Sequence, residues 1–215
     1  MISVIHPTRR LTKAMECVTQ WIGRADNPKD IEYILSIDAD DNPELYLSIL
    51  EAAQTYVKRF HIVIESNENV VQAMNEGAKA AKGDILVCIS DDFICPQGWD
   101  SIIKANVNIE KEEALKVNDG ISKMTDLILT LPILTKKLYD TLGYIYYHEY
   151  TGMHADNDLA ELCEKMGVLK KMDVVFKHEH WLTNHYKKDA VNERHHNKTG
   201  LVQGASLLRR RRKEF

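Results

Sequence analysis

The stretch GDILVCISDDF, from Gly83 to Phe93, is an apolar run that ends abruptly in two adjacent carboxylates. Five consecutive apolar residues, 85–89, are typical of a central strand in a parallel sheet that is covered on both faces. In open α/β sheets the ligand crevice lies beyond the carboxyl ends of the strands. We therefore expect Asp91 and Asp92 to lie on the floor of a crevice.

Two adjacent carboxylates repel each other, so they need a nearby cation or several hydrogen-bond donors. The alternative is an Asx-type turn, in which Asp91 only caps the residues that follow. The pair by itself fits both interpretations.

The composition is that of a soluble globular protein: of 215 residues, 44% are hydrophobic and 28% charged, enough for one α/β domain with a sizeable core. No apolar run approaches membrane-spanning length, and residues 1–5 lack the features of a signal peptide, so we expect a cytoplasmic protein without a membrane span. The four cysteines form no CxxC pair, which favours reduced thiols over a disulfide framework or a thiolate zinc site.

Strand-like and helix-like segments alternate over roughly the first hundred residues. Strands are expected at 3–5, 31–37, 61–64 and 85–89, and helices at 11–22, 43–56 and 70–81. Asn42 is expected to cap the second helix and Gly83 to close the third. This alternation predicts a doubly wound, mostly parallel sheet.

The pattern changes after Asp92. Helices are expected at 96–106, 132–142 and 159–166, strands at 115–117 and 127–131, and a final strand at 173–180. No internal repeat and no linker rich in Gly, Ser or Pro divides the chain.

Three predicted strand ends carry acidic or histidine side chains: Asp38 with Asp40, Asp91 with Asp92, and His178 with His180. All of them are able to converge on one crevice. Alternation along the last strand places His178 and His180 on one face, roughly 6.5 Å apart. A lone histidine is more often structural, but imidazole with carboxylate suits a divalent metal such as Mn²⁺, with Zn²⁺ and Mg²⁺ as alternatives.

At this point the chain resembles a compact, phage-type family-two glycosyltransferase with the GT-A fold, over most of residues 1–181. Residues 3–9, SVIHPTR, resemble the family's opening strand and the Pro-Thr turn that lines its nucleotide pocket. Asp38 falls where the family places an Asp on uracil. Asn75-Glu76-Gly77 and the AKGD of residues 81–84 match the segments that introduce the metal-binding strand.

Two acidic motifs extend the resemblance. Ser90-Asp91-Asp92 is similar to the Asp-x-Asp motif, with Ser90 where an acid is usual and Asp92 at the metal-binding position. Residues 155–159, ADNDL, resemble the Glu-Asp-x-Asp-Leu segment whose first Asp, here Asp156, is the catalytic base. His178 lies where many such enzymes supply a late metal ligand, and His180 is the second choice.

The resemblance implies a Rossmann-like three-layer α/β sandwich that transfers a sugar from a UDP-sugar to an acceptor hydroxyl with inversion. The acceptor is a saccharide, a protein or a modified nucleic acid. The implied domain is 1–183, with a nucleotide-binding half at 1–92, an acceptor half at 93–183, and a polar to basic tail at 184–215. The implied nucleotide-binding residues are Pro7, Thr8, Arg9, Asp38, Asp40, Asn75 and Asp91, and those for Mn²⁺ or Mg²⁺ are Asp92, His178 and His180.

The residue types suit this chemistry. Sugar transfer needs a cation to neutralise the leaving diphosphate and a base near the acceptor hydroxyl. Asp92 with a histidine would supply the first, and Asp156 the second. From residue type alone, however, Asp156 is better interpreted as a helix N-cap ahead of Leu159.

Other residues have two interpretations. The tyrosines of 144–150 would stack on an acceptor or pack in the core, while Trp99 and Trp181 are expected to pack in the core or at its rim. Arg209–Lys213 is either a nucleic-acid-binding block or a solvated helix end. Nucleotidyl transfer is a further alternative, but it would need a Gly-rich phosphate loop, and residues 6–10 contain no glycine.

Overall fold

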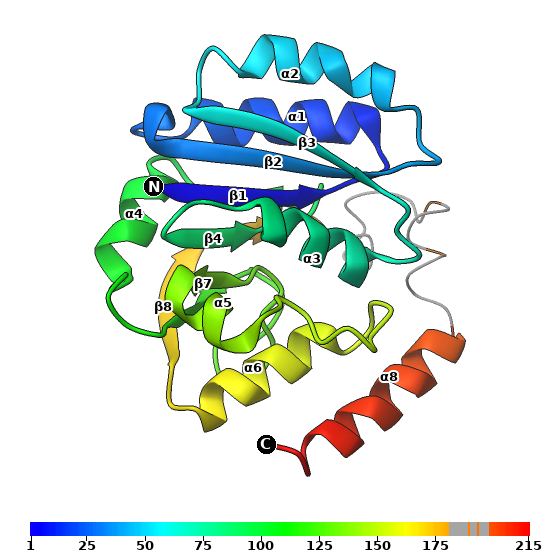
Figure 1. Ribbon diagram of the computed structural model, residues 1–215. Coiled ribbons are helices and arrows are strands. Elements are labelled where there is room, and N and C mark those ends of the chain that lie inside the picture. The colour runs from blue at the N-terminus through cyan, green and yellow to red at the C-terminus, as the bar shows by residue number, and fades with distance from the viewer. Residues whose placement is uncertain (181–188, 190–192, 194–197) are drawn as a thin grey trace.

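The computed structural model describes residues 1–180, 189, 193 and 198–215, so that Trp181 and most of the segment before the last helix lie outside the described residues. Within them, a seven-stranded sheet has the order β3-β2-β1-β4-β7-β6-β8 (Figure 1). Its strands are β1 (Ile2–Pro7), β2 (Ile31–Asp38), β3 (Arg59–Glu65), β4 (Ile85–Cys88), β6 (Ala114–Asn118), β7 (Ile133–Thr135) and β8 (Leu169–Val175). The short strands β5 (Phe93–Ile94) and β9 (Lys177–His178) pair separately.

Helices cover both faces of the sheet. The helices are α1 (Leu11–Gly23), α2 (Leu47–Ala53), α3 (Val70–Ala80), α4 (Trp99–Asn106), α5 (Lys136–Leu142), α6 (Ala155–Lys165) and α8 (Lys198–Arg211), with 3₁₀ turns η1 (Pro28–Asp30) and η2 (Pro43–Tyr46). Side chains of α1, α2 and α4 share one apolar core with the sheet, and those of α3, α5 and α6 share the other. Successive residues of β1 point into different cores, Val4 into the first and Ile5 into the second. The predicted three-layer sandwich is confirmed.

The sheet is mostly parallel. β1 pairs in parallel with β2 and β4, β2 with β3, and β6 with β8, whereas β7 runs antiparallel to both of its neighbours. The carboxyl ends of β1, β2 and β4 therefore finish side by side, and the residues that follow them share one edge of the sheet.

The predicted strand at 127–131 is wrong. Leu129 and Leu131 are buried, but the strand forms at Ile133–Thr135, where the sequence predicted the start of a helix. The carbonyl of Pro132 accepts a hydrogen bond from the Cys88 amide (2.8 Å), which carries the segment into the sheet. Thr135 then caps α5 by accepting from the amide of Leu138 (3.3 Å). Pairing with β4 overrides the helix-start signal of Pro132.

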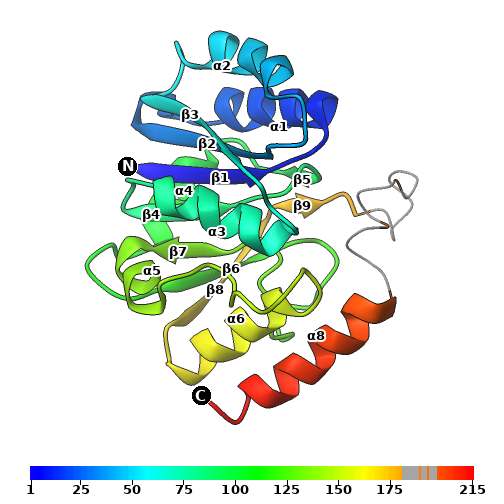
Figure 2. The ribbon, with the colours of Figure 1, turned by 45° about the vertical axis from the view of Figure 1, so that its right-hand side comes forward.

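The predicted final strand, 173–180, is divided in two. β8 begins earlier, at Leu169, and ends at Val175, after which buried Phe176 packs against Trp21. The chain then pairs with β5, so that His178 lies opposite Phe93. β9 therefore lies beside β5 (Figure 2), and the amide of Glu179 donates to the carbonyl of Asp92 (2.8 Å).

Two helix ends also differ from the prediction. The helix after Asn42 begins as η2 without a side-chain cap, and α2 ends at Ala53, before Tyr56. α3 ends at Ala80, so Gly83 does not close it. A Cβ atom on Gly83 would lie 2.6 Å from Ser3 Oγ and 2.7 Å from Ser3 N, so this glycine is required by the close approach to β1.

Helix α8 packs along α6, as both ribbon views show. Arg210 pairs with Glu149 (2.5 Å) and Arg212 with Glu161 (2.5 Å), while Arg211 is buried. The chain's own carboxylates thus neutralise much of the basic block, and nothing in this packing supports the nucleic-acid interpretation. None of the described helices combines the length and apolar character of a membrane span.

Candidate active site

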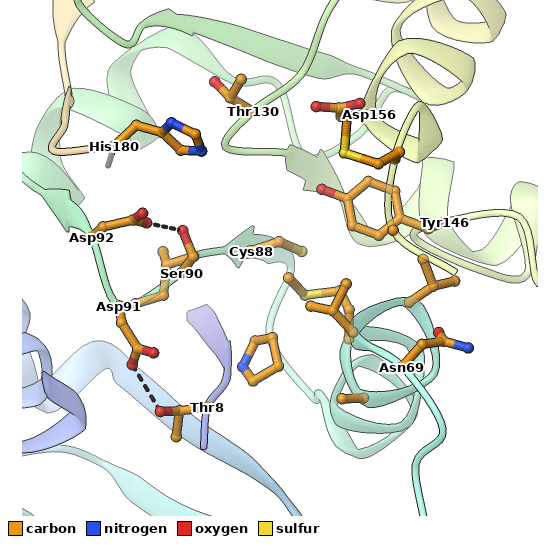
Figure 3. A pocket seen from close by; sticks show the side chains of 18 of the residues that line it. Thr8, Asn69, Cys88, Ser90, Asp91, Asp92, Thr130, Tyr146, Asp156 and His180 are labelled. Atoms are coloured by element: carbon orange, nitrogen blue, oxygen red, sulfur yellow. Dashed lines mark hydrogen bonds between the residues drawn. The ribbon is translucent and has the colours of Figure 1, made fainter. Parts of the chain in front are cut away.

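A cavity of about 360 Å³ opens beyond the carboxyl ends of β1, β2 and β4, where the strand pattern predicted a crevice (Figure 3). Its walls come from the loops after these strands, the start of α3, the loop between β6 and β7, the segment between α5 and α6, the start of α6, and the residues around β9. Nine of the predicted site residues line it: Pro7, Thr8, Arg9, Asp38, Asp91, Asp92, Asp156, His178 and His180.

Three side chains hold the carboxylate of Asp91. His6 Nε2 lies 2.9 Å from Oδ1, the Thr8 hydroxyl donates to the same oxygen (2.8 Å), and Arg10 donates to Oδ2 (3.2 Å). His6 is itself fixed by the hydroxyl of Tyr33 at 2.9 Å from Nδ1. The side chain of Asp91 is only 4% exposed, so this carboxylate ties β4 to the turn after β1.

Asp92 meets the end of β9. Ser90 donates to Asp92 Oδ1 (2.5 Å), and His178 Nε2 lies 3.4 Å from the same oxygen. The ring of His178 stacks on Phe93, with centroids 4.2 Å apart, and the ring of His180 lies edge-on to His178 at 5.0 Å. The three predicted metal-binding side chains are therefore neighbours on one side of the cavity.

Asp92 and His178 supply part of the ligand set that a divalent cation needs. Among the described residues, no group of three or more His, Cys, Asp or Glu side chains is arranged to hold an ion. Asp92 and His178 offer one oxygen and one nitrogen within reach of a single cation. Cations such as Mg²⁺ are commonly bound by one or two carboxylates with the rest of the shell supplied by substrate phosphates. The pair fits a cation whose coordination a diphosphate completes.

Arg9 joins Asp38, the last residue of β2, to Asp40 in the turn that follows. Its guanidinium bonds Asp38 and also reaches Asp40, with Nη2 3.1 Å from Oδ2. The hydrogen bond that Arg9 donates to Asp40 and the charges of both acids raise the pKa of Arg9 despite its partial burial. Asp38 is buried and lines the cavity, whereas Asp40 is exposed and is outside the described lining.

The side chain of Asn75 holds the segment after α5 in place. Its side-chain oxygen accepts from the amides of Ile145 and Tyr146 (3.0 Å each), and its nitrogen donates to the carbonyl of Tyr146 (2.7 Å). Among the described residues it does not belong to the cavity lining, so the geometry gives no support to its predicted nucleotide contact. Instead, Asn75 places Tyr146, which does line the cavity.

Asp156 lies across the cavity from Asp92, in the first turn of α6 (Figure 3). The N-cap of this helix is His154, with φ +70°, so the capping interpretation of Asp156 is wrong. The carboxylate accepts from the amide of Asn157 (2.9 Å). Burial raises the pKa of Asp156, opposed by backbone hydrogen bonds and by the nearby charges of His154 and His178.

The loop between β6 and β7 forms a wall that the sequence did not predict. Asp119, at the end of β6, accepts hydrogen bonds from the amides of Ile121 and Ser122 and from the hydroxyl of Thr130 (2.7 Å). Burial acts to raise the pKa of Asp119, but these donors outweigh it and hold the pKa below the ordinary value. Thr130 is thereby fixed at the cavity surface.

The aromatic residues divide between core and cavity. Tyr146 is largely buried yet lines the cavity, and Tyr150 is buried with its hydroxyl on Asp158 (3.2 Å). Trp99 is fully buried and donates to the carbonyl of Trp21 (2.7 Å), which confirms its predicted core packing.

Residues 9–112 match the family described as Glycosyl transferase family 2. These residues belong to glycosyl transferase family 2. With the GT-A fold, the match makes the chain a nucleotide-sugar-dependent glycosyltransferase. No curated protein matches this glycosyltransferase at a significant level.

Solved structures share the fold of this glycosyltransferase. A crystal structure of residues 1–349 of TarS from S. aureus has a TM-score of 0.67 at 12% identity, covering 100% of this chain and 72% of that one. A longer TarS structure is covered over only 36% of its length. At these identities the likeness shows the GT-A fold alone.

Two further structures carry nucleotides and metal. The mannosyltransferase PcManGT from Pyrobaculum calidifontis, in complex with GDP-Man and Mn²⁺, has a TM-score of 0.63 at 17% identity and covers 100% of this chain and 75% of its own. Glucosyl-3-phosphoglycerate synthase from Mycobacterium tuberculosis, in complex with Mn²⁺, UDP and phosphoglyceric acid, has a TM-score of 0.64 at 15% identity. This match covers 98% of this chain and 78% of the synthase.

Proposed function

We propose that this glycosyltransferase moves a sugar from a UDP-sugar to an acceptor hydroxyl, with a divalent cation and with inversion at the anomeric carbon. The observation that carries the proposal is the placement of Asp92 and Asp156 on opposite sides of one cavity. Structures with the same fold contain UDP with Mn²⁺ or Mg²⁺, which supports this donor and cofactor.

The donor is assigned to the half formed by residues 1–92. Pro7, Thr8 and Arg9 would border the nucleoside, and Asp38 would accept from the uracil imide. Asp91 contributes by fixing the turn after β1. Asp92 with His178 or His180 would hold Mn²⁺ or Mg²⁺, which supplies charge neutralisation for the leaving diphosphate when bound.

The acceptor is assigned to the half formed by residues 93–183. Asp156 takes the proton of the acceptor hydroxyl while that oxygen bonds to the anomeric carbon. The bond from this carbon to the diphosphate breaks, and UDP leaves with the electron pair. Because the base and the diphosphate lie on opposite sides of the sugar, the configuration inverts. A carboxylate whose burial raises its pKa is a stronger base than an exposed one.

The test is Asp156→Asn, which keeps the size of the side chain but cannot accept the proton. Turnover should fall by roughly 10²–10⁴-fold, the usual contribution of a positioned general base, with UDP affinity almost unchanged. Asp140→Asn, at an exposed carboxylate on α5 paired with Lys136, is the matched control and should behave as wild type. Full turnover by the Asp156 variant would exclude the assigned role.

A further inference from the structure

We propose that helix α8 is part of the acceptor half of the active site, where Arg211 and Gly204 position Asp156 through the start of α6. This inference rests on the proposed role of Asp156 as the base. None of the described residues of α8 lines the cavity, so the helix acts through α6 and not on the substrate.

Arg211 is the buried contact between the two helices. It is 8% exposed, and its Nε lies 3.3 Å from Asp158 Oδ1. Its guanidinium lies 3.9 Å above the ring of Tyr147 and donates to the hydroxyl of Tyr144 (3.2 Å). The hydroxyl of Tyr150 donates to the same oxygen of Asp158 (3.2 Å). A buried charge is tolerated only when partners satisfy it, so this network fixes its members relative to one another.

The network reaches Asp156 through the geometry of α6. Asp158 follows Asp156 by two residues in the same helical turn, which is about 3 Å along the axis and about 200° around it. Asp156 lies at the cavity surface, while Asp158 is buried and meets Arg211 of α8. Arg211 therefore holds the helix on the side away from the substrate, and a displacement of this turn would carry the base with it.

Gly204 makes the second contact, on the segment that enters α6. A Cβ atom at this position would collide with the carbonyl oxygen of Met153 and lie 3.2 Å from His154 Cδ2. His154 has a left-handed conformation that costs energy in a residue other than glycine and persists where the surroundings enforce it. The close approach of α8 supplies that constraint two residues before Asp156.

The neighbouring arginines offer a matched comparison. Arg212 joins α8 to Glu161 on the same helix α6, but this pair lies at the surface, with the Arg212 side chain 51% exposed. Exposed ion pairs contribute little because solvent screens them. Both arginines connect α8 to α6, but of the two only Arg211 bonds a residue in the helical turn that contains Asp156.

The experiment compares Arg211→Gln and Gly204→Ala with the controls Arg212→Gln and Val202→Ala, the latter at an exposed position of α8. The probe is UDP release from whichever of UDP-glucose, UDP-galactose and UDP-GlcNAc the wild-type chain turns over, with water as acceptor. UDP affinity is measured by calorimetry with Mn²⁺. The test variants should lose roughly 10–100-fold in kcat, the effect of misplacing a catalytic group by about 1 Å, with UDP affinity within about twofold. Both controls should retain wild-type values.

Wild-type kcat in Arg211→Gln and Gly204→Ala, beside an inactive Asp156→Asn, would overturn the role of α8 and leave the base in place. A fully active Asp156→Asn would instead overturn the proposed function. If Arg211→Gln does not fold, Gly204→Ala carries the test, because it alters the contact of α8 with the segment before α6 and leaves the buried Arg211–Asp158 pair in place. Equal loss of kcat in Arg212→Gln would also contradict the inference.

Discussion

The two sides of the cavity are built differently. On the donor side, Asp91 and Asp92 lie just beyond the buried strand β4, and Asp91 is held by His6 in the adjacent strand β1 and by Thr8 just after it. On the acceptor side, Asp156 belongs to helix α6. Arg211, which lies 53 residues after Asp158 in the sequence, bonds this helix at Asp158. The donor side is thus fixed by the sheet, and the acceptor side by contacts between distant segments. Substitutions on the donor side should therefore affect nucleotide binding, and substitutions on the acceptor side should affect turnover.

The largest expected effect on the donor side is that of Asp92→Ala. Removing the proposed metal ligand should weaken Mn²⁺-dependent UDP binding by more than about 100-fold, since loss of residues that merely orient ligands already costs 10–100-fold. The fold should persist, because Asp92 lies beyond the end of β4 and belongs to neither apolar core. Calorimetry with Asp140→Ala as control measures the effect. Unchanged affinity for UDP and Mn²⁺ would remove Asp92 from the site.

A smaller effect distinguishes the two histidines. His178 is held by stacking on Phe93 and lies 3.4 Å from Asp92, so we expect His178→Ala to weaken Mn²⁺ binding about 10–100-fold and His180→Ala to have less effect. Metal titrations in the presence of UDP measure both variants. The assignment is reversed if His180→Ala alone loses the metal.

The donor side was predictable from sequence and the acceptor side much less so. The strand–helix alternation and the acids after residues 85–89 are local signals, and they placed the cavity and the three-layer fold. The role of His6 was missed, although its position beside the Pro-Thr turn and next to the acidic strand end was a usable signal. Partners of a buried carboxylate depend on the register of two strands, which no local pattern fixes.

Long-range packing accounts for the remaining errors. The basic residues 209–213 resemble a solvated helix end, yet Arg211 is buried because aromatic and acidic partners converge on it from other segments. The nucleotide contact of Asn75 stays a prediction, and the structural partners of its side chain are backbone groups some 70 residues later, which no local pattern indicates. The strand at 133–135 was missed because its pairing with β4 overrides the helix signal of Pro132.

On the acceptor side, pH should affect turnover through Asp156. Burial raises its pKa, and the base acts only when deprotonated. The acid limb of kcat should therefore have its midpoint above the ordinary aspartate value of about 3.9, with activity rising as pH increases through it. A pH–rate profile measures this limb, and it should be absent from the residual activity of Asp156→Asn. A midpoint at or below the ordinary value would show that this carboxyl is not the group being titrated.

The proposal that Asp156 and the diphosphate lie on opposite sides of the sugar is tested most directly by the anomeric configuration of the first product. Proton NMR of the sugar released or transferred from an α-linked UDP-sugar, recorded before mutarotation equilibrates the anomers, reports whether the anomeric carbon was attacked from the face opposite the diphosphate. We predict the β-anomer. Release of the α-anomer would contradict attack assisted by Asp156 from the opposite side of the cavity.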